Sequence, residues 1–408
     1  MTSFRSRLSF PSPRPRFRAS ILVSFALSFG VAIAVRPAAA AEQHLARHPK
    51  PLGPGERPSA LPAYGERLGV PARSDADRQF DRIVDDYLLY QFRNQPVRAT
   101  NVGIHDFDDF LPATDRIGIE TSISDLEGYL ARLSKLEIAH LGRERRFDHA
   151  MLTSRLRGTL LDLQTIQPWK HDPNFYLSIA SGGIHALLKR DFAPLEDRVW
   201  NVVARLTEIP RVFSDARANL ENPPQAYTEI AIAQSAGVVH FLADQVPAGV
   251  ASIRDPVLRQ EFDHHLAAAV GAANDFHDWL KTDLLPRSQG DFALGADTYA
   301  KKLLYDEMVA TPLDSLYRHG EAALHETQRR MEKEANAIEP GLSVQDALAR
   351  LARDAPSARS LVPAAEAKLG KIRSFVAEHG ILTPPEHEDL RVAETPVFHR
   401  SLSFASMD

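Results

Sequence analysis

Apolar residues recur at helical spacing along most of the chain from residue 76 onward. A helix places residues i, i+3, i+4 and i+7 on one face, so each such stripe predicts a helix that buries this face. Four stripes are clear: Phe80, Ile83, Val84, Tyr87 and Leu88; Phe147, Met151, Leu152, Leu156, Leu160, Leu163 and Ile166; Val199, Val203, Leu206, Val212, Phe213, Ala216 and Leu220; and Val257, Leu258, Phe262, Leu266, Val270, Phe276, Leu280 and Leu284.

Capping residues predict where several helices begin and end. Pro96 ends the first stripe, because proline favours an extended residue before it. Thr311-Pro312 predicts a helix start, with threonine accepting the free amides and proline in the first turn. Ser343, three residues before Asp346, predicts another. The helix that follows Pro312 would carry the stripe Leu313, Leu316, Tyr317, Leu324, Met331, Ala335 and Ile338.

The stripes predict a mainly α fold, with one multi-helix domain of roughly ten helices over residues 76–380. Alternating strand patterns are scarce before about residue 390. Residues 381–408 hold Pro384, Pro385 and Pro396 without a helical stripe, and are predicted to be extended. Their apolar end lacks a partner segment, so we expect them to begin a C-terminal part that this chain does not contain.

The N-terminus has the pattern of a secretory signal peptide over residues 1–41. A region with five arginines and no acid precedes an apolar run at residues 19–35, and small residues follow. We expect cleavage near Ala40 or Ala41 and an exported protein, periplasmic or extracellular. The alternative is an uncleaved membrane anchor, for which 17 apolar residues are at the lower limit. Residues 42–75, rich in proline, are predicted to form a flexible linker.

Composition narrows the possible chemistry. The 408 residues are 44% apolar and 25% charged, as in ordinary globular proteins, and include no cysteine. Disulfides, thiolate metal sites and a thiol nucleophile are therefore excluded. Removing residues 1–41 leaves 42 basic against 53 acidic side chains, a formal charge of −11. This charge disfavours nucleic acids and, after signal cleavage, membranes as partners.

Metal-binding patterns are incomplete. His325 and His387 each precede a glutamate, but Arg329 and Arg391 stand where a zinc-protease helix needs its second histidine. Arginine does not ligate cations, so both segments are interpreted as solvated surface. Two Glu-x-x-His steps, Glu261 with His264 beside Asp263 and His265, and Glu137 with His140, resemble half-sites of di-iron bundles. The remaining glutamates of such a site are not identifiable, so we predict no metal site.

Nucleophile patterns are also weak, and no catalytic residue is predicted. Ser235 lies one residue away from the nucleophile-elbow pattern, but its surroundings predict a continuous helix instead of a strand and a sharp turn. Ser181-Gly182-Gly183 is interpreted as a helix break, without the lysine of a phosphate loop.

One loop, residues 100–109, gathers a histidine and three aspartates around Gly103. His105 and Asp108 are the candidate substrate-binding residues, in contact with a substrate or a metal at the rim of a cleft. The alternative, which turn chemistry favours, is a capped turn whose carboxylates bond backbone amides.

The order of several segments resembles a bacterial family called "domain of unknown function 885", over about residues 76–408. The segments are Pro96 to Thr100 with Gly103, His105 and Asp108; Pro168-Trp169 and Asp172 to Tyr176; Asp191 to Pro194; Arg205 to Pro210; Asn219-Leu220, Pro223-Pro224 and Tyr227 to Ile232; Leu294-Gly295 and Tyr299; residues 311–321; and Arg391 to Pro396.

This resemblance implies an α-helical relative of the zinc-dependent gluzincin peptidases. It implies a His-Glu motif followed by Pro-Gly-His and an acidic ligand, in which zinc would activate water for attack on a peptide. The motif would lie beyond residue 408, so no residue here inherits a ligand or base role, and zinc is expected only in a full-length relative.

Two functions follow from these expectations. The first is the exported N-terminal helical scaffold of a zinc-dependent peptidase-like hydrolase, inactive by itself, with a peptide as substrate. The second is a complete, non-catalytic periplasmic helical binding protein, whose acidic surface recognises a basic or peptide partner.

Overall fold

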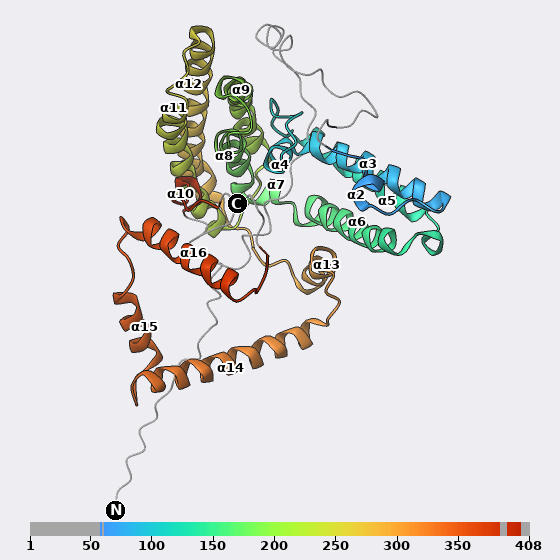
Figure 1. The fold of residues 1–408 in the computed structure, drawn as a ribbon. Helices are drawn as coiled ribbons and strands as arrows, with labels where there is room; N and C mark the ends of the chain where they lie inside the picture. Colours follow the sequence, from blue (N-terminus) through green and yellow to red (C-terminus); the bar gives the residue numbers. More distant parts are fainter. Residues whose placement is uncertain (1–57, 59–60, 384–389, 401–408) are drawn as a thin grey trace, which may run out of the picture. The chain divides into compact units, whose positions relative to one another are not determined.

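A computed structural model describes residues 58, 61–383 and 390–400, and in them all regular secondary structure is helical (Figure 1). The predicted mainly α fold is therefore confirmed. The α-helices are α2 Tyr64–Leu68, α3 Asp75–Asn94, α4 Pro96–Asn101, α5 Arg116–Ser134, α6 Arg143–Leu161, α7 Pro168–His171, α8 Asn174–Leu188, α9 Leu195–Asn219, α10 Gln225–His240, α11 Val246–Gly249, α12 Pro256–Trp279, α13 Ala296–Asp306, α14 Leu313–Ile338, α15 Val344–Arg353 and α16 Leu361–Glu378. Short 3₁₀ or π segments are η2 Ile138–His140, η3 Asp162–Ile166, η4 Phe241–Gln245, η5 Leu280–Leu284, η6 Leu285–Arg287 and η7 Val397–His399.

The helices divide into two compact units, where the sequence predicts one domain over residues 76–380. Unit 1 includes residues 85–122 and 168–289, and unit 2 includes residues 64–84, 123–167 and 290 onward. The chain passes between the units within α3 and within α5. A continuous helix carries no sequence mark of such a passage, which is why the periodicity predicts a single domain.

Unit 1 is a bundle in which α9 packs against α8 and α12, and α10 packs against the same two helices (Figure 1). Every member of the predicted α9 stripe, from Val199 to Leu220, is buried, and the helix continues through Pro210. The stripe of α12 is buried except at Val257, which is 59% exposed in the first turn, and at Val270, which is half-buried. Apolar periodicity therefore identifies the core of this unit.

Gly183 lies inside α8, so the predicted helix break at Ser181-Gly182-Gly183 is wrong. A Cβ atom at Gly183 would lie 2.5 Å from Cδ2 of Leu111, which is itself buried. The missing side chain thus allows the segment that holds Leu111 to pack closely against α8, and the helix continues despite glycine's low propensity.

In unit 2, the buried face of α6 differs from the predicted stripe. Phe147 and Met151 are each 60% exposed, whereas Arg145 and His149 are buried. The Arg145 guanidinium donates to both carboxylate oxygens of Asp81, from Nε at 2.7 Å and Nη2 at 2.9 Å. An arginine that is paired with a carboxylate can be buried inside a helical bundle. A prediction based on apolar residues alone does not include such an arginine.

The predicted apolar stripe of α14 is also mostly exposed. Ala335 is the buried residue of this helix, while Tyr317, Leu324 and Ile338 are more than half exposed. The helix begins after Pro312, which makes no side-chain capping bond, so the predicted threonine cap at Thr311 is wrong.

The second predicted helix start is confirmed. Ser343 precedes α15, and its Oγ accepts the backbone amide of Asp346 at 3.0 Å.

Because this bond satisfies one of the free amides of α15, Ser343→Ala is expected to destabilise the first turn by about 1 kcal/mol. Hydrogen exchange measures this locally, as faster exchange of the Asp346 amide. Ser360→Ala is the matched control, since Ser360 precedes α16 without capping it. Equal exchange at Asp346 in wild type and Ser343→Ala would contradict the capping role.

The ends of the described chain contain some structure that the sequence analysis did not predict. The predicted linker, residues 42–75, includes α2, in which Tyr64 is buried and donates to Asp148. The signal peptide and its cleavage region at Ala40 and Ala41 lie outside the described residues. Of residues 381–408, residues 390–396 lack regular structure and Phe398 in η7 is buried. No helix in the described ranges is long and apolar enough to cross a membrane.

Candidate functional site

The loop after α4 places His105 and Asp108 together, as their spacing suggested. Asp108 is 2% exposed. Its carboxylate accepts hydrogen bonds from Thr100 Oγ1 at 2.5 Å and from His105 Nδ1 at 2.8 Å. These partners are side chains, whereas the capped-turn interpretation expects backbone amides. The loop is thus organised around one buried carboxylate.

A fully buried cation, Arg205 of α9, holds this loop from inside unit 1. Its guanidinium donates to Thr100 Oγ1 at 2.8 Å, to the Phe110 carbonyl at 2.9 Å and to the Gly183 carbonyl at 2.7 Å. Its Nη2 lies 3.9 Å from Oδ1 of Asp108. Burial lowers the pKa of Arg205 to about 10, although the negative charges of Asp108 and Asp109 act to raise it. The side chain therefore stays charged at neutral pH.

His105 is the exposed end of this network. Its side chain is 32% exposed, and its ring stacks on Phe192 with centroids 3.7 Å apart. An ionised carboxylate only accepts, so Nδ1 carries the proton that is donated to Asp108. In the neutral ring Nε2 is then an acceptor, held in one orientation by the carboxylate and by Phe192.

The sequence analysis did not identify Arg205. The available signal is its position between Val203 and Leu206, because a charged residue inside a buried apolar stripe needs a partner. Nothing in the sequence indicates that the partner lies in the loop of residues 100–110.

The structure also joins Ser235 to a histidine of another helix. Ser235 lies in the continuous helix α10, as predicted, and its Oγ is 2.7 Å from Nδ1 of His277 in α12. Burial lowers the pKa of His277, and Lys281 adds to this, so the imidazole is neutral at pH 7 and can accept this bond. Ser235 is 1% exposed. A substrate would not reach it, and the bond links α10 to α12 within the core.

In the two Glu-x-x-His segments, each glutamate lies in a pair with one histidine. His265 Nε2 lies 3.5 Å from Glu261, and His140 Nδ1 lies 2.6 Å from Glu137. Glu326, next to His325, pairs with Arg329. Zinc sites use three or four protein ligands. Within the described residues no group of three or more His, Asp or Glu could hold a metal ion, so these residues do not fit zinc. His387 lies outside the described residues.

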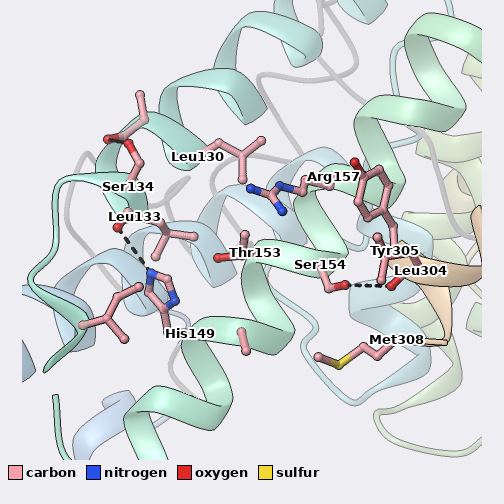
Figure 2. Close-up of a pocket in the computed structure, with 13 residues that line it drawn as sticks. Leu130, Leu133, Ser134, His149, Thr153, Ser154, Arg157, Leu304, Tyr305 and Met308 are labelled. Atoms are coloured by element: carbon pink, nitrogen blue, oxygen red, sulfur yellow. Dashed lines mark hydrogen bonds between the residues drawn. The ribbon is translucent and has the colours of Figure 1, made fainter. Parts of the chain in front are cut away.

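A groove of about 720 Å³ in unit 2 is a second candidate site (Figure 2). It lies among α5, η2, α6 and α13, and its size falls within the range of small-molecule sites. Most lining residues are aliphatic: Leu130, Ala131, Leu133, Ile138, Ala150, Leu304 and Met308. The residues come from segments far apart in sequence, so no local pattern indicates the groove.

Three polar side chains in the groove, His149, Thr153 and Arg157, lie along one face of α6 at intervals of four residues, and Ser154 lies next to Thr153 (Figure 2). His149 Nε2 lies 3.3 Å from the Leu133 carbonyl oxygen, and Ser154 donates to the Leu304 carbonyl at 3.4 Å. Thr153 Oγ1 is buried and has no hydrogen-bond partner among the described residues. The fourth polar side chain is Arg157, which is exposed and 6.0 Å from the ring centroid of Tyr305.

Comparisons with known proteins give a family and a structural neighbour. The model of a family described as "Bacterial protein of unknown function (DUF885)" matches residues 96–408. A solved structure described as that of "a putative lipoprotein of unknown function from Shewanella oneidensis" superposes with a TM-score of 0.60 at 22% sequence identity. The match covers 79% of this chain and 61% of that chain, so this chain spans less than two thirds of its neighbour. No curated protein matches.

Proposed function

The chain belongs to the DUF885 family of bacterial proteins of unknown function, and from this membership we propose that it is the helical, substrate-binding part of an exported peptidase-like hydrolase. Export is supported by the signal-peptide pattern of residues 1–41 and by the description of the neighbour as a lipoprotein. The peptidase-like role rests on the resemblance of the family to gluzincin peptidases. In such enzymes zinc polarises the scissile carbonyl.

The observation that carries a substrate-binding role is the pair of His105 and Asp108. A buried carboxylate orients a partly exposed imidazole, and Nε2 faces away from the bond to Asp108 as an acceptor. A peptide N–H can donate to this nitrogen. Because Arg205 and Thr100 fix the carboxylate, the imidazole is held in place before a substrate binds, which lowers the entropic cost of binding.

We expect the purified protein to bind peptides from a tryptic digest of casein without cutting them. These peptides end in lysine or arginine, so they suit the acidic surface. His105→Ala removes one hydrogen bond and is expected to weaken binding about threefold to tenfold in equilibrium dialysis with mass-spectrometric detection. His319→Ala, at an exposed position of α14, is the matched control.

Two results would contradict this proposal in different ways. Equal binding by wild type and His105→Ala would show that His105 does not contact the peptide. Zinc-dependent cleavage of the peptides, or one tightly held zinc per protein molecule, would show that the chain is itself a catalyst.

The alternative function, a non-catalytic binding protein, is favoured by the groove of unit 2. A preformed apolar site with a few polar side chains is typical of ligand binding and needs no reacting group. Ligand binding at the groove that His105→Ala leaves unchanged would favour this alternative.

A further inference from the structure

Two polar groups of the groove in unit 2 can bind a ligand: a buried hydroxyl without a hydrogen-bond partner among the described residues, and an exposed guanidinium. Thr153 Oγ1 is buried without a partner in the described part of the chain, although a buried hydroxyl usually has one. Four residues along the same face of α6, Arg157 lines the groove with its guanidinium exposed, 6.0 Å from the Tyr305 ring centroid and in no ion pair with the described residues. A hydroxyl and a guanidinium one turn apart can together bind a carboxylate.

The walls around this polar pair suit a hydrocarbon chain. Leu130 and Leu133 of α5 line one side, and Leu304 of α13 and Met308, which follows that helix, line another (Figure 2). Ile138 of η2 also lines the groove. His149 and Arg157 are eight residues apart on α6, which corresponds to about 12 Å along the helix axis. This length and the volume of about 720 Å³ accommodate a single chain of medium length.

The hydrogen bonding of the groove favours such a chain over a peptide. A peptide brings an N–H and a C=O at every residue, and each loses free energy when buried without a partner. His149, Ser154 and Ser134 already bond backbone carbonyls. This leaves Thr153 and Arg157, with the Tyr305 hydroxyl, for a ligand. One carboxylate uses Thr153 and Arg157, and an alkyl chain needs no other groups.

We propose that the groove among α5, α6 and α13 binds a single-chain aliphatic carboxylate, with the carboxylate at Arg157 and Thr153 and the chain along Leu130, Leu133 and Ile138. This proposal is independent of the peptidase-like role, because all its residues belong to unit 2 and His105 belongs to unit 1.

Isothermal titration with dodecanoate, kept below its micelle concentration, tests this site in the purified protein. One saturable site per molecule is expected. Dodecanol, which has the same chain without the charge, is expected to bind about tenfold or more weakly, because a hydrogen bond to a charged group contributes more than one to a neutral group.

Four variants separate the parts of the site. Arg157→Gln is expected to weaken dodecanoate binding about tenfold and leave dodecanol unchanged. Arg146→Gln, the same change at an exposed position of α6 outside the groove, is the control and should bind as wild type. Ala150→Phe fills the groove and is expected to abolish binding of both probes. Thr153→Val keeps the shape and is expected to weaken dodecanoate binding about threefold without lowering stability, because the hydroxyl has no partner to lose.

Three outcomes would overturn the proposal. The first is dodecanoate binding that does not saturate, or that Ala150→Phe leaves unchanged. The second is an equal effect of Arg157→Gln and Arg146→Gln, which would indicate general attraction to positive charge. The third is tighter binding of the peptide acetyl-Ala-Ala-Leu than of dodecanoate with the same loss in Arg157→Gln, which would assign the groove to peptide C-termini.

Discussion

Replacing Arg205 with methionine is expected to lower the free energy of unfolding of unit 1 by about 3–5 kcal/mol. The methionine fills much of the same volume, so the loss comes from the groups that Arg205 leaves behind. Asp108 remains buried beside no cation, and the carbonyls of Phe110 and Gly183 lose their donors. Buried acceptors without partners each cost about 1–3 kcal/mol.

Tryptophan fluorescence follows the unfolding of unit 1 selectively. All three tryptophans of the chain, Trp169, Trp200 and Trp279, lie in unit 1. A urea titration followed by fluorescence therefore measures the change in unit 1 alone. Arg190→Met is the control, since Arg190 is exposed and, among the described residues, donates only to the Asn101 carbonyl. This change is expected to cost less than about 1 kcal/mol. A loss below 1 kcal/mol in Arg205→Met would show that the buried network does not stabilise the unit.

Comparing the predicted apolar stripes with the buried faces of the helices shows where apolar periodicity succeeds and where it fails. It identifies the apolar residues buried by α9, because these side chains pack without a specific partner, but it misses Arg205, which is buried on the same helix. It fails on α6, where burial depends on the pairing of Arg145 with Asp81, 64 residues earlier. A periodicity analysis counts residue types along one helix, and such a pairing depends on a second helix.

The candidate sites also divide into residues that are close in the sequence and residues that only the fold brings together. His105 and Asp108 are three residues apart, so the sequence brings them together as candidates, and the structure joins them by a hydrogen bond. Arg205, which fixes their loop, comes almost a hundred residues later in the chain. The groove is lined by Leu130 of α5 and Leu304 of α13, which are far apart in the sequence, so only the packed structure shows that they share a site.

A second large effect is expected at Asp77, which connects the starts of two helices in unit 2. Ser74 Oγ accepts the Asp77 amide at 2.9 Å and Asp77 accepts the Ser74 amide at 3.3 Å, the reciprocal bonds of a capping box at the start of α3. Its carboxylate also accepts the amides of Arg73 and of Gly142, which precedes α6, each at 2.8 Å. The sequence contains this signal, Ser74 three residues before Asp77 and ahead of an apolar stripe, but it is not among the helix starts predicted above.

Asp77→Ala is expected to destabilise unit 2 by about 2–4 kcal/mol, because three backbone amides lose their acceptor at a position that is 2% exposed. Hydrogen exchange should show the loss as faster exchange of the Ser74 and Gly142 amides. The control is Asp75→Ala in the same turn, whose exposed carboxylate pairs with Arg78 at the surface and is expected to contribute less than about 1 kcal/mol. Slow exchange at Gly142 in Asp77→Ala would contradict a link between α3 and α6.

The pH dependence of this contribution has a definite sign. Burial alone would raise the pKa of Asp77, but the amides of Gly142, Arg73 and Ser74 and the charge of Arg145 together hold it below its ordinary value. A carboxylate with a lowered pKa in the folded state stabilises the fold above its unfolded pKa of about 3.9, and this contribution is lost as pH falls through the folded pKa.

Asp77→Asn keeps one acceptor oxygen and does not ionise. Thermal unfolding followed by circular dichroism should therefore show a stability gap between wild type and Asp77→Asn that is largest near pH 7 and narrows below about pH 4. A gap that stays constant over this range would mean that the ionised carboxylate contributes no more than the neutral amide.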